Sequence, residues 1–145
     1  MSSAWFQRTF KLKSRKRGCY LITDEILAPI HEALSTFKMG LCNIFLHHTS
    51  AGLALCENYD PTVQKDMENV FNKLVPEGKG LYQHDCEGPD DMPAHVKSVL
   101  SGASINIPIT GGSLGLGTWQ GIWLMEYRTH MHTREVTVTL QGVKK

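Results

Sequence analysis

The segment REVTVTL at residues 134–140 decides the fold class, because apolar and polar side chains alternate along it. Its two valines and Leu140 point to one face of the backbone, while its threonines point to the other. Alternation with period two is typical of a β-strand with one buried face. Strand patterns also occupy residues 104–109 and 117–127, so the last part of the chain is predicted to be all strand.

Three earlier strands are predicted from the same kind of pattern. Residues 6–12 alternate, residues 19–23 follow a basic turn at 14–18, and residues 41–48 are apolar enough for a buried central strand. The first two of these strands are expected to pair as neighbours across the turn.

The first predicted helix follows Thr23, where acidic residues occupy the turn that the helix dipole favours. Apolar residues at 26, 30, 34 and 37 share one face, and Gly40 is the expected stop. Pro29 predicts a late start or a kink.

Two more helices have clear starts. Asp60-Pro61 supplies an N-cap and a first-turn proline, and apolar residues at 63, 67, 70, 71 and 74 form the expected inner stripe. A short helix is predicted over 91–100, with Gly102 beyond its end.

The composition is that of one globular domain: 145 residues, 41% hydrophobic and 20% charged. A net charge of +1 argues against a dedicated nucleic-acid-binding protein. No apolar run suits a membrane helix or a secretory signal, so a cytoplasmic location without a membrane partner is expected. The four cysteines lack CxxC spacing and are expected to be reduced thiols. We therefore predict a single domain over residues 1–145, of α+β class, with a mainly antiparallel, sandwich-like β-sheet, two longer helices and one short helix.

Histidines gather among polar groups in the middle of the sequence. His48 ends the predicted central strand, His84 begins an acidic loop, and His95 lies near the start of the short helix. A helix N-terminus disfavours imidazolium, and neutral imidazole is the form that ligates metals. These histidines predict a site together with the carboxylates of Asp85, Glu87 and Asp91.

The chemistry of that site has three interpretations. Histidines and carboxylates beside a helix start suit a zinc-type centre with an open position. The carboxylates would equally suit magnesium, with substrate phosphates completing its coordination. Alternatively, the histidines only hydrogen-bond the loop in place. The nearby pair His130 and His132 is expected to lie at the surface.

The strand at 117–127 carries polar residues on one face, at Thr118, Gln120 and Glu126. A buried Gln or Glu needs partners, which the wall of a site would supply. The alternative places that face in solvent, with Trp119 and Trp123 in the core.

Several long motifs resemble those of one family. They are Arg17-Gly18 with LITDEI at 21–26, HTSA at 48–51, DPTV at 60–63, HD at 84–85 with EGPDDMPAH at 87–95, and GTWQGIWL at 117–124. From Trp5 to Gly142 the chain resembles the YjbQ family, whose members are described as secondary thiamine-phosphate synthases.

The resemblance implies an α+β domain that assembles as a homotrimer. It implies coupling of a hydroxymethylpyrimidine diphosphate to a thiazole phosphate, with release of pyrophosphate, and hence a small phosphorylated substrate. It also implies a divalent metal ion, zinc or magnesium, near His48, His84 and His95. Catalytic candidates at matching polar positions are Glu57, Asp85, Asp91, Gln120 and Glu126. Candidates for substrate binding are Thr49, Ser50, Thr118 and Arg134.

The chain departs from the family pattern at a few positions. Ser113 and Glu135 replace frequent arginines, Cys56 replaces a frequent Asn, and Met131-His132 replaces Gly-Gly. Fewer arginines weaken the expected diphosphate binding, because Arg is the best bidentate partner of phosphate. Two alternatives therefore stay open: a metal-dependent hydrolase of a small phosphate compound, and a non-catalytic metal- or ligand-binding trimer.

Overall fold

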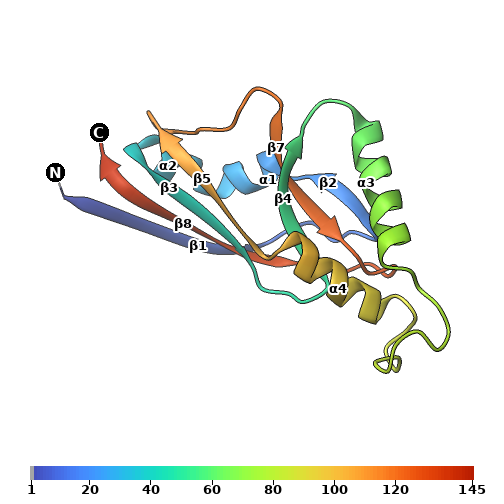
Figure 1. Cartoon of the computed structure of the whole chain (residues 1–145). Coiled ribbons are helices and arrows are strands. Elements are labelled where there is room, and N and C mark those ends of the chain that lie inside the picture. Colours follow the sequence, from blue (N-terminus) through green and yellow to red (C-terminus); the bar gives the residue numbers. More distant parts are fainter. Residues whose placement is uncertain (1) are drawn as a thin grey trace.

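Two antiparallel β-sheets and a few helices build the fold, which is of α+β class as predicted (Figure 1). The computed structural model describes residues 2–145. The larger sheet has five strands in the order β1 (Ser3–Lys11), β8 (Glu135–Lys144), β3 (Phe37–Leu46), β5 (Ser104–Thr110) and β6 (Ser113–Leu114). The smaller sheet has three strands in the order β2 (Gly18–Leu21), β7 (Gln120–Glu126) and β4 (Ala51–Glu57).

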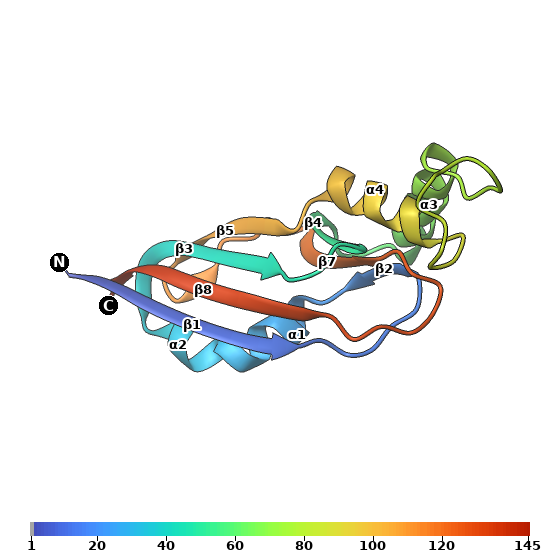
Figure 2. The same cartoon turned by 90° about the horizontal axis from the view of Figure 1, so that it is seen from below.

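The helices lie in two groups. Short segments form the first group: α1 (Thr23–Leu27), a 3-10 turn (Ala28–Ile30) and α2 (His31–Ser35). The longer helices α3 (Pro61–Leu74) and α4 (Asp91–Ser101) pack on the three-stranded sheet, away from the chain termini (Figures 1 and 2). The Asp60 side chain caps α3 by accepting a hydrogen bond from the Thr62 amide, as the sequence predicts.

The core follows the alternation of the last strand. Val136, Val138 and Leu140 are fully buried, in the main cluster of apolar side chains. A second cluster packs Trp123 and Tyr127 of the β7 region against α3 and α4. The three-stranded sheet therefore has packed side chains on both faces.

Strand pairing differs from the prediction. The first two strands lie in different sheets, with β1 paired to β8 and β2 paired to β7. The intervening residues act as a crossover rather than a hairpin, because each strand finds its partner in the C-terminal part of the chain. The strand β4 was not predicted, since its apolar residues follow the histidine pair without alternation.

The helix predictions need two corrections. The first helix is interrupted at the 3-10 turn that contains Pro29, in agreement with the predicted kink, but it ends at Ser35, so Phe37 and Gly40 belong to β3. In α3 the expected inner stripe is only partly covered, since Val70 and Leu74 are exposed. Among the described residues, no helix combines the length and apolar character required to cross a membrane.

Candidate functional site

Three side chains converge at the N-terminal end of α4. Asp91 is the first residue of that helix, His95 follows one turn later, and His84 comes from the preceding loop. The Asp91 Oδ2 atom lies 2.6 Å from His84 Nε2 and 3.2 Å from His95 Nε2. All three candidate ligand atoms lie within 4.8 Å of one another, and no other such group occurs among residues 2–145. We call His84, Asp91 and His95 the ligand group.

The orientation of His95 is set by the backbone. Its Nδ1 atom lies 2.6 Å from the carbonyl oxygen of Thr49, and a carbonyl can only accept. The proton of a neutral His95 ring is therefore on Nδ1, and the Nε2 lone pair faces the Asp91 carboxylate. Two lone pairs at that distance repel unless a cation, either a proton or a metal ion, lies between them.

Asp91 is the buried member of the ligand group, with 1% of its side chain exposed. Burial alone would raise its pKa, but the hydrogen bond with His84, the charge of His95 when that ring is protonated and the charge of Arg128 hold the pKa below its ordinary value. Asp91 is therefore a carboxylate at neutral pH, which is the form that ligates metals.

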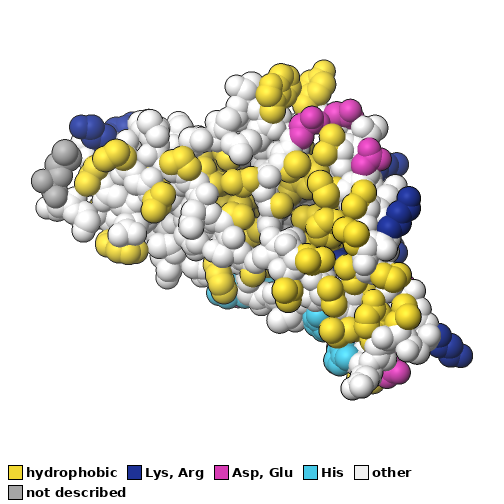
Figure 3. Space-filling model, viewed as in Figure 1, with side chains coloured by type: hydrophobic (Ala, Val, Ile, Leu, Met, Phe, Trp, Pro, Cys, Tyr) yellow, Lys and Arg dark blue, Asp and Glu magenta, His cyan; other side chains and the backbone are white. Residues whose placement is uncertain are grey.

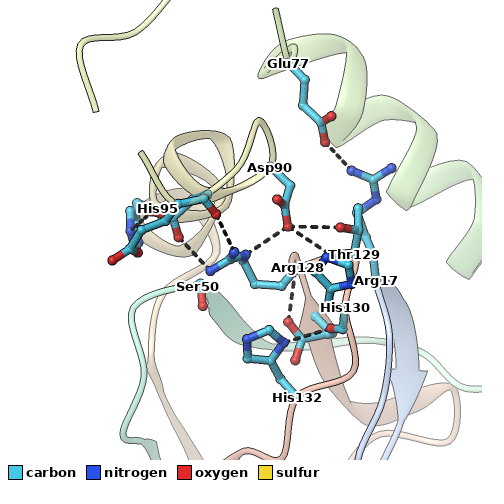
Figure 4. Close-up of polar contacts among 12 residues, drawn as sticks. Arg17, Ser50, Glu77, Asp90, His95, Arg128, Thr129, His130 and His132 are labelled. Atoms are coloured by element: carbon cyan, nitrogen blue, oxygen red, sulfur yellow. Dashed lines mark hydrogen bonds and ion pairs between the residues drawn. The ribbon is translucent and has the colours of Figure 1, made fainter. Parts of the chain in front are cut away.

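Arg128 holds the other side of this carboxylate. Its Nη1 atom donates to Asp91 Oδ1 at 2.8 Å, and its Nε atom donates to Asp90 Oδ2 at 2.8 Å (Figure 4). Its Nη2 atom donates to the Glu87 carbonyl at 3.0 Å. Burial would raise the pKa of Asp90, but hydrogen bonds from the Thr129 amide and Arg128 lower it to about 2.

The donor set fits a divalent ion. Two imidazole nitrogens and one carboxylate oxygen are the three protein ligands of many catalytic zinc sites, which keep a fourth position open. The hydrogen bond from His95 Nδ1 to a carbonyl is the outer contact that metal-bound histidines usually make.

A pocket of about 510 Å³ adjoins the ligand group, and His84 lines it. Its walls come mainly from the loop between α3 and α4, where Glu77 forms an ion pair with Arg17. Asp85 and Lys79 supply opposite charges, while Tyr82 and Pro93 supply apolar surface. The histidines visible in Figure 3 lie along the lower edge of the molecule, part of which is formed by α4.

His48, predicted as a third histidine ligand, does not join the ligand group. Its Nε2 atom accepts a hydrogen bond from the Glu135 amide at 2.7 Å. Burial, followed by the positive charge of Arg134, lowers the pKa of His48, so the ring is neutral and suited to accept. The neighbouring Thr49 contributes its backbone carbonyl to His95.

Glu126 and Arg134, predicted for catalysis and substrate binding, bind each other. The Arg134 Nε and Nη2 atoms donate to the Glu126 carboxylate at 2.6 and 2.5 Å, and both side chains are buried. Arg134 also donates to the carbonyl and hydroxyl oxygens of Ser50. This network uses the polar groups of Ser50, Glu126 and Arg134 internally, so they do not face the pocket.

The remaining candidates lie at the opposite end of the β4–β7 pair, where Glu57 is registered with Gln120. Glu57 accepts from the Asp60 amide at 3.0 Å, and Gln120 accepts from the Gly117 amide at 2.8 Å. The Thr118 carbonyl accepts from Asn58. These contacts stabilise turns. The structure therefore brings together Asp91, His84 and His95, with Asp85 on the pocket wall, and separates the others from them.

Arg128 is the site residue that sequence reasoning missed. It follows β7 by two positions, in a segment singled out only for its histidines. The sequence gives only a weak signal for this role, namely an arginine just beyond a buried strand that ends in a glutamate. The signal is weak because its partners Asp90 and Asp91 are more than thirty residues away.

Comparison with known proteins gives a consistent result. The family profile described as "UPF0047 protein YjbQ-like" matches residues 8–143. The UPF0047 protein YjbQ of Escherichia coli O157:H7 is 48% identical over 95% of this chain and 99% of its own. The Salmonella typhimurium protein of the same name is 51% identical over the same shares.

Solved structures share the fold. A YbjQ-like protein of unknown function from Sulfolobus solfataricus superposes with a TM-score of 0.83 at 22% identity, covering 97% of this chain and 99% of that one. A conserved hypothetical protein from Thermus thermophilus gives a TM-score of 0.77 at 32% identity, covering 90% and 97%.

These comparisons correct the functional expectation. The matched proteins carry only the family designation, and the Sulfolobus protein is described as being of unknown function. The expectation of thiamine-phosphate synthase activity is therefore wrong as a conclusion from the family, since it rested on the resemblance and the descriptions of the matched proteins give no such activity. The function has to be argued from the ligand group and its surroundings.

Proposed function

Because the chain belongs to the YjbQ-like UPF0047 family, which brings no assigned activity with it, we propose a function from the site alone. The protein binds a divalent metal ion through His84, Asp91 and His95 and presents it to a small molecule in the adjoining pocket. One observation carries the proposal: the Thr49 carbonyl fixes the proton of His95 on Nδ1, so the Nε2 lone pair faces a buried carboxylate. A divalent cation satisfies both groups at once, as a second proton on His95 would, and the zinc measurement distinguishes the two.

The donor set favours zinc over magnesium. Imidazole suits zinc and its neighbours in the transition series, whereas magnesium prefers an octahedral shell of oxygens. Three protein ligands leave a coordination position for a ligand of the ion. When bound, such an ion acts as a Lewis acid toward the group at that position.

The metal is tested by measuring zinc in purified protein after supplementation and dialysis. We expect about one zinc per chain in the wild type and its loss in His84→Ala and His95→Ala. The matched control is His31→Ala, which removes an exposed histidine from a different surface hollow. Circular dichroism of each variant checks that the fold is retained. A wild type without zinc, or histidine variants that keep it, would contradict the proposal.

The ligand of the pocket is proposed to be a small phosphorylated molecule. Lys79 on the pocket wall and the metal ion would be the cations that meet its phosphate. Calorimetric titration of the zinc-loaded protein with inorganic phosphate tests this class. Binding that weakens in Lys79→Ala supports it, and the absence of binding argues against it.

The proposed homotrimer has a candidate contact surface on the five-stranded sheet. The outward positions of β1, β8, β3 and β5 are aligned in register, and Figure 2 shows these strands side by side. No charged residue occupies an outward position of β1 between Ser3 and Thr9, or a position of the other three strands aligned with these. On the same face, Trp5, Leu41 and Phe45 are exposed. Exposed apolar side chains gathered on an uncharged face are typical of an interaction surface, so this face suits contact between copies.

The mass of the protein in solution tests the assembly. Light scattering should give three chains for the wild type and a smaller species for Leu41→Glu, which puts a charge on the uncharged face. Val99→Glu is the control, because Val99 is an exposed apolar residue of α4. A monomeric wild type would overturn this proposal.

A further inference from the structure

We propose that Arg128 is a positioning residue for the ligand group, and that it works through a ring of hydrogen bonds connecting Asp91 with His95. This inference rests on the proposed metal site and assigns a role to residues that do not themselves touch the ion.

The first part of the ring is the guanidinium of Arg128. Its Nε atom binds Asp90, as Figure 4 shows, while Nη1 binds Asp91 and Nη2 binds the Glu87 carbonyl. Because Oδ1 of Asp91 accepts from Arg128, Oδ2 is the oxygen left facing the two histidines. A planar guanidinium fixes the rotation of the carboxylate, which a single point charge would not do.

The ring continues through the backbone of Arg128 itself. Its amide donates to Glu126 Oε2 at 3.0 Å, and that carboxylate is held by Arg134 in the buried ion pair. Arg134 donates in turn to both oxygens of Ser50.

The ring is completed at Thr49, the residue before Ser50. Ser50 follows Thr49, whose carbonyl oxygen accepts from His95 Nδ1 and so determines which nitrogen of that ring faces Asp91. Two members of the ligand group are therefore oriented by one connected network, which involves the end of β7 and the starts of β4 and β8. The Glu126–Arg134 pair therefore contacts the residues that orient the ligands, not the ligands themselves.

The expected effect of breaking this network is on metal affinity. Contacts to the outer side of metal ligands typically change affinity by about 10–100-fold when removed. A purely structural role for Arg128 would instead lower the stability of the metal-free protein and leave its zinc affinity and coordination geometry unchanged.

The test compares two variants with a matched control. Arg128→Ala removes the guanidinium, and Arg128→Lys keeps the charge but replaces the planar fork with a single ammonium. Arg15→Ala is the control, since Arg15 is also an ion-paired arginine with 15% of its side chain exposed, and it binds Glu25 instead. Each protein is titrated with zinc against a competing chelator, and the visible spectrum of its cobalt(II) form reports the coordination geometry.

We expect zinc affinity to fall about 10–100-fold in Arg128→Ala, with only partial recovery in Arg128→Lys and an altered cobalt spectrum in both. Arg15→Ala should bind zinc as the wild type does. The inference is overturned if wild type and both Arg128 variants bind zinc equally, while a wild type that binds no zinc overturns the metal site itself. Should Arg128→Ala fail to fold, the lysine variant still decides the outcome through its affinity and spectrum.

Discussion

The strands β8 and β7 show two ways of using a central strand. In β8 the buried residues alternate with partly exposed threonines, so one face packs and the other faces outward. In β7 every residue from Gly121 to Glu126 is buried, because α3 and α4 cover the face that the main core leaves free.

This difference determines which of the two strands is connected to the candidate site. The outward face of β8 carries hydroxyl and amide side chains that bond along the surface, as Thr139 does with Gln7. The end of β7 instead buries Glu126, whose charge must be matched by Arg134 and by the backbone that leads to the ligand group. A polar residue on the outward face of the five-stranded sheet therefore costs little stability. A buried polar residue in the three-stranded sheet instead requires a hydrogen-bonded network.

The largest expected effect comes from breaking the buried ion pair. Glu126→Ala leaves the Arg134 charge buried without its partner, and we expect the free energy of unfolding to fall by about 3–5 kcal/mol. Urea denaturation measures this. The control is Glu135→Ala on β8, where the residue is half-buried and should change stability by less than about 1 kcal/mol. Equal losses in the two variants would remove the contrast between the strands.

Acid should lower the stability of the protein through the carboxylates near the ligand group, since the uncharged positions on the outer face of the five-stranded sheet have no group to titrate. The pKa of Asp90 is lowered to about 2 and that of Asp91 is also lowered, so both carboxylates stabilise the folded protein above their unfolded pKa. That stabilisation is lost as the pH falls from about 4 toward 2. Urea denaturation of the metal-free protein across this range should show a smaller loss for Asp90→Asn than for the wild type. An identical pH dependence in both proteins would refute the role of Asp90.

The smallest effect is expected on the outer face of the five-stranded sheet. Thr139→Ala removes the acceptor of the 2.9 Å hydrogen bond from Gln7, in an exposed row of the sheet. In the Leu41→Glu background, where this face is expected to be open to water, stability should fall by no more than about 1 kcal/mol, because water replaces the lost partner. Thermal unfolding measures the change. A loss comparable to that of Glu126→Ala would show that this face is as constrained as β7.

Much of the secondary structure could be predicted because it depends on neighbouring residues. The alternation of β8, the Asp60 cap of α3 and the start of α4 at Asp91 are all local patterns. The first helix was predicted too long because Phe37 fits a helical apolar stripe as well as a buried strand position. The strand β4 was missed because its apolar residues do not alternate.

The candidate site could be predicted only in part. Metal-ligating residue types in an acidic loop beside a helix start indicated His84, Asp91 and His95, since the loop and helix are contiguous. His48 carried the same type of signal, but its ring is engaged by the Glu135 amide. Glu126 looked like a site residue because it is a polar group in an apolar strand, and Arg134 because of the family resemblance. The two form a buried ion pair instead.

The sequence by itself therefore determined the fold class, most of the elements and two of the three members of the ligand group as metal candidates, because these depend on periodicity and on residues close in the chain. Only the tertiary structure decided which strands pair, that Arg128 holds Asp91, and that Thr49 orients His95 from 46 residues away. Those contacts join groups whose separation along the chain carries no local signal. They exist because β4 and β7 pair in one sheet and α4 packs against β4, which brings the start of β4, the end of β7 and the start of α4 to the same place.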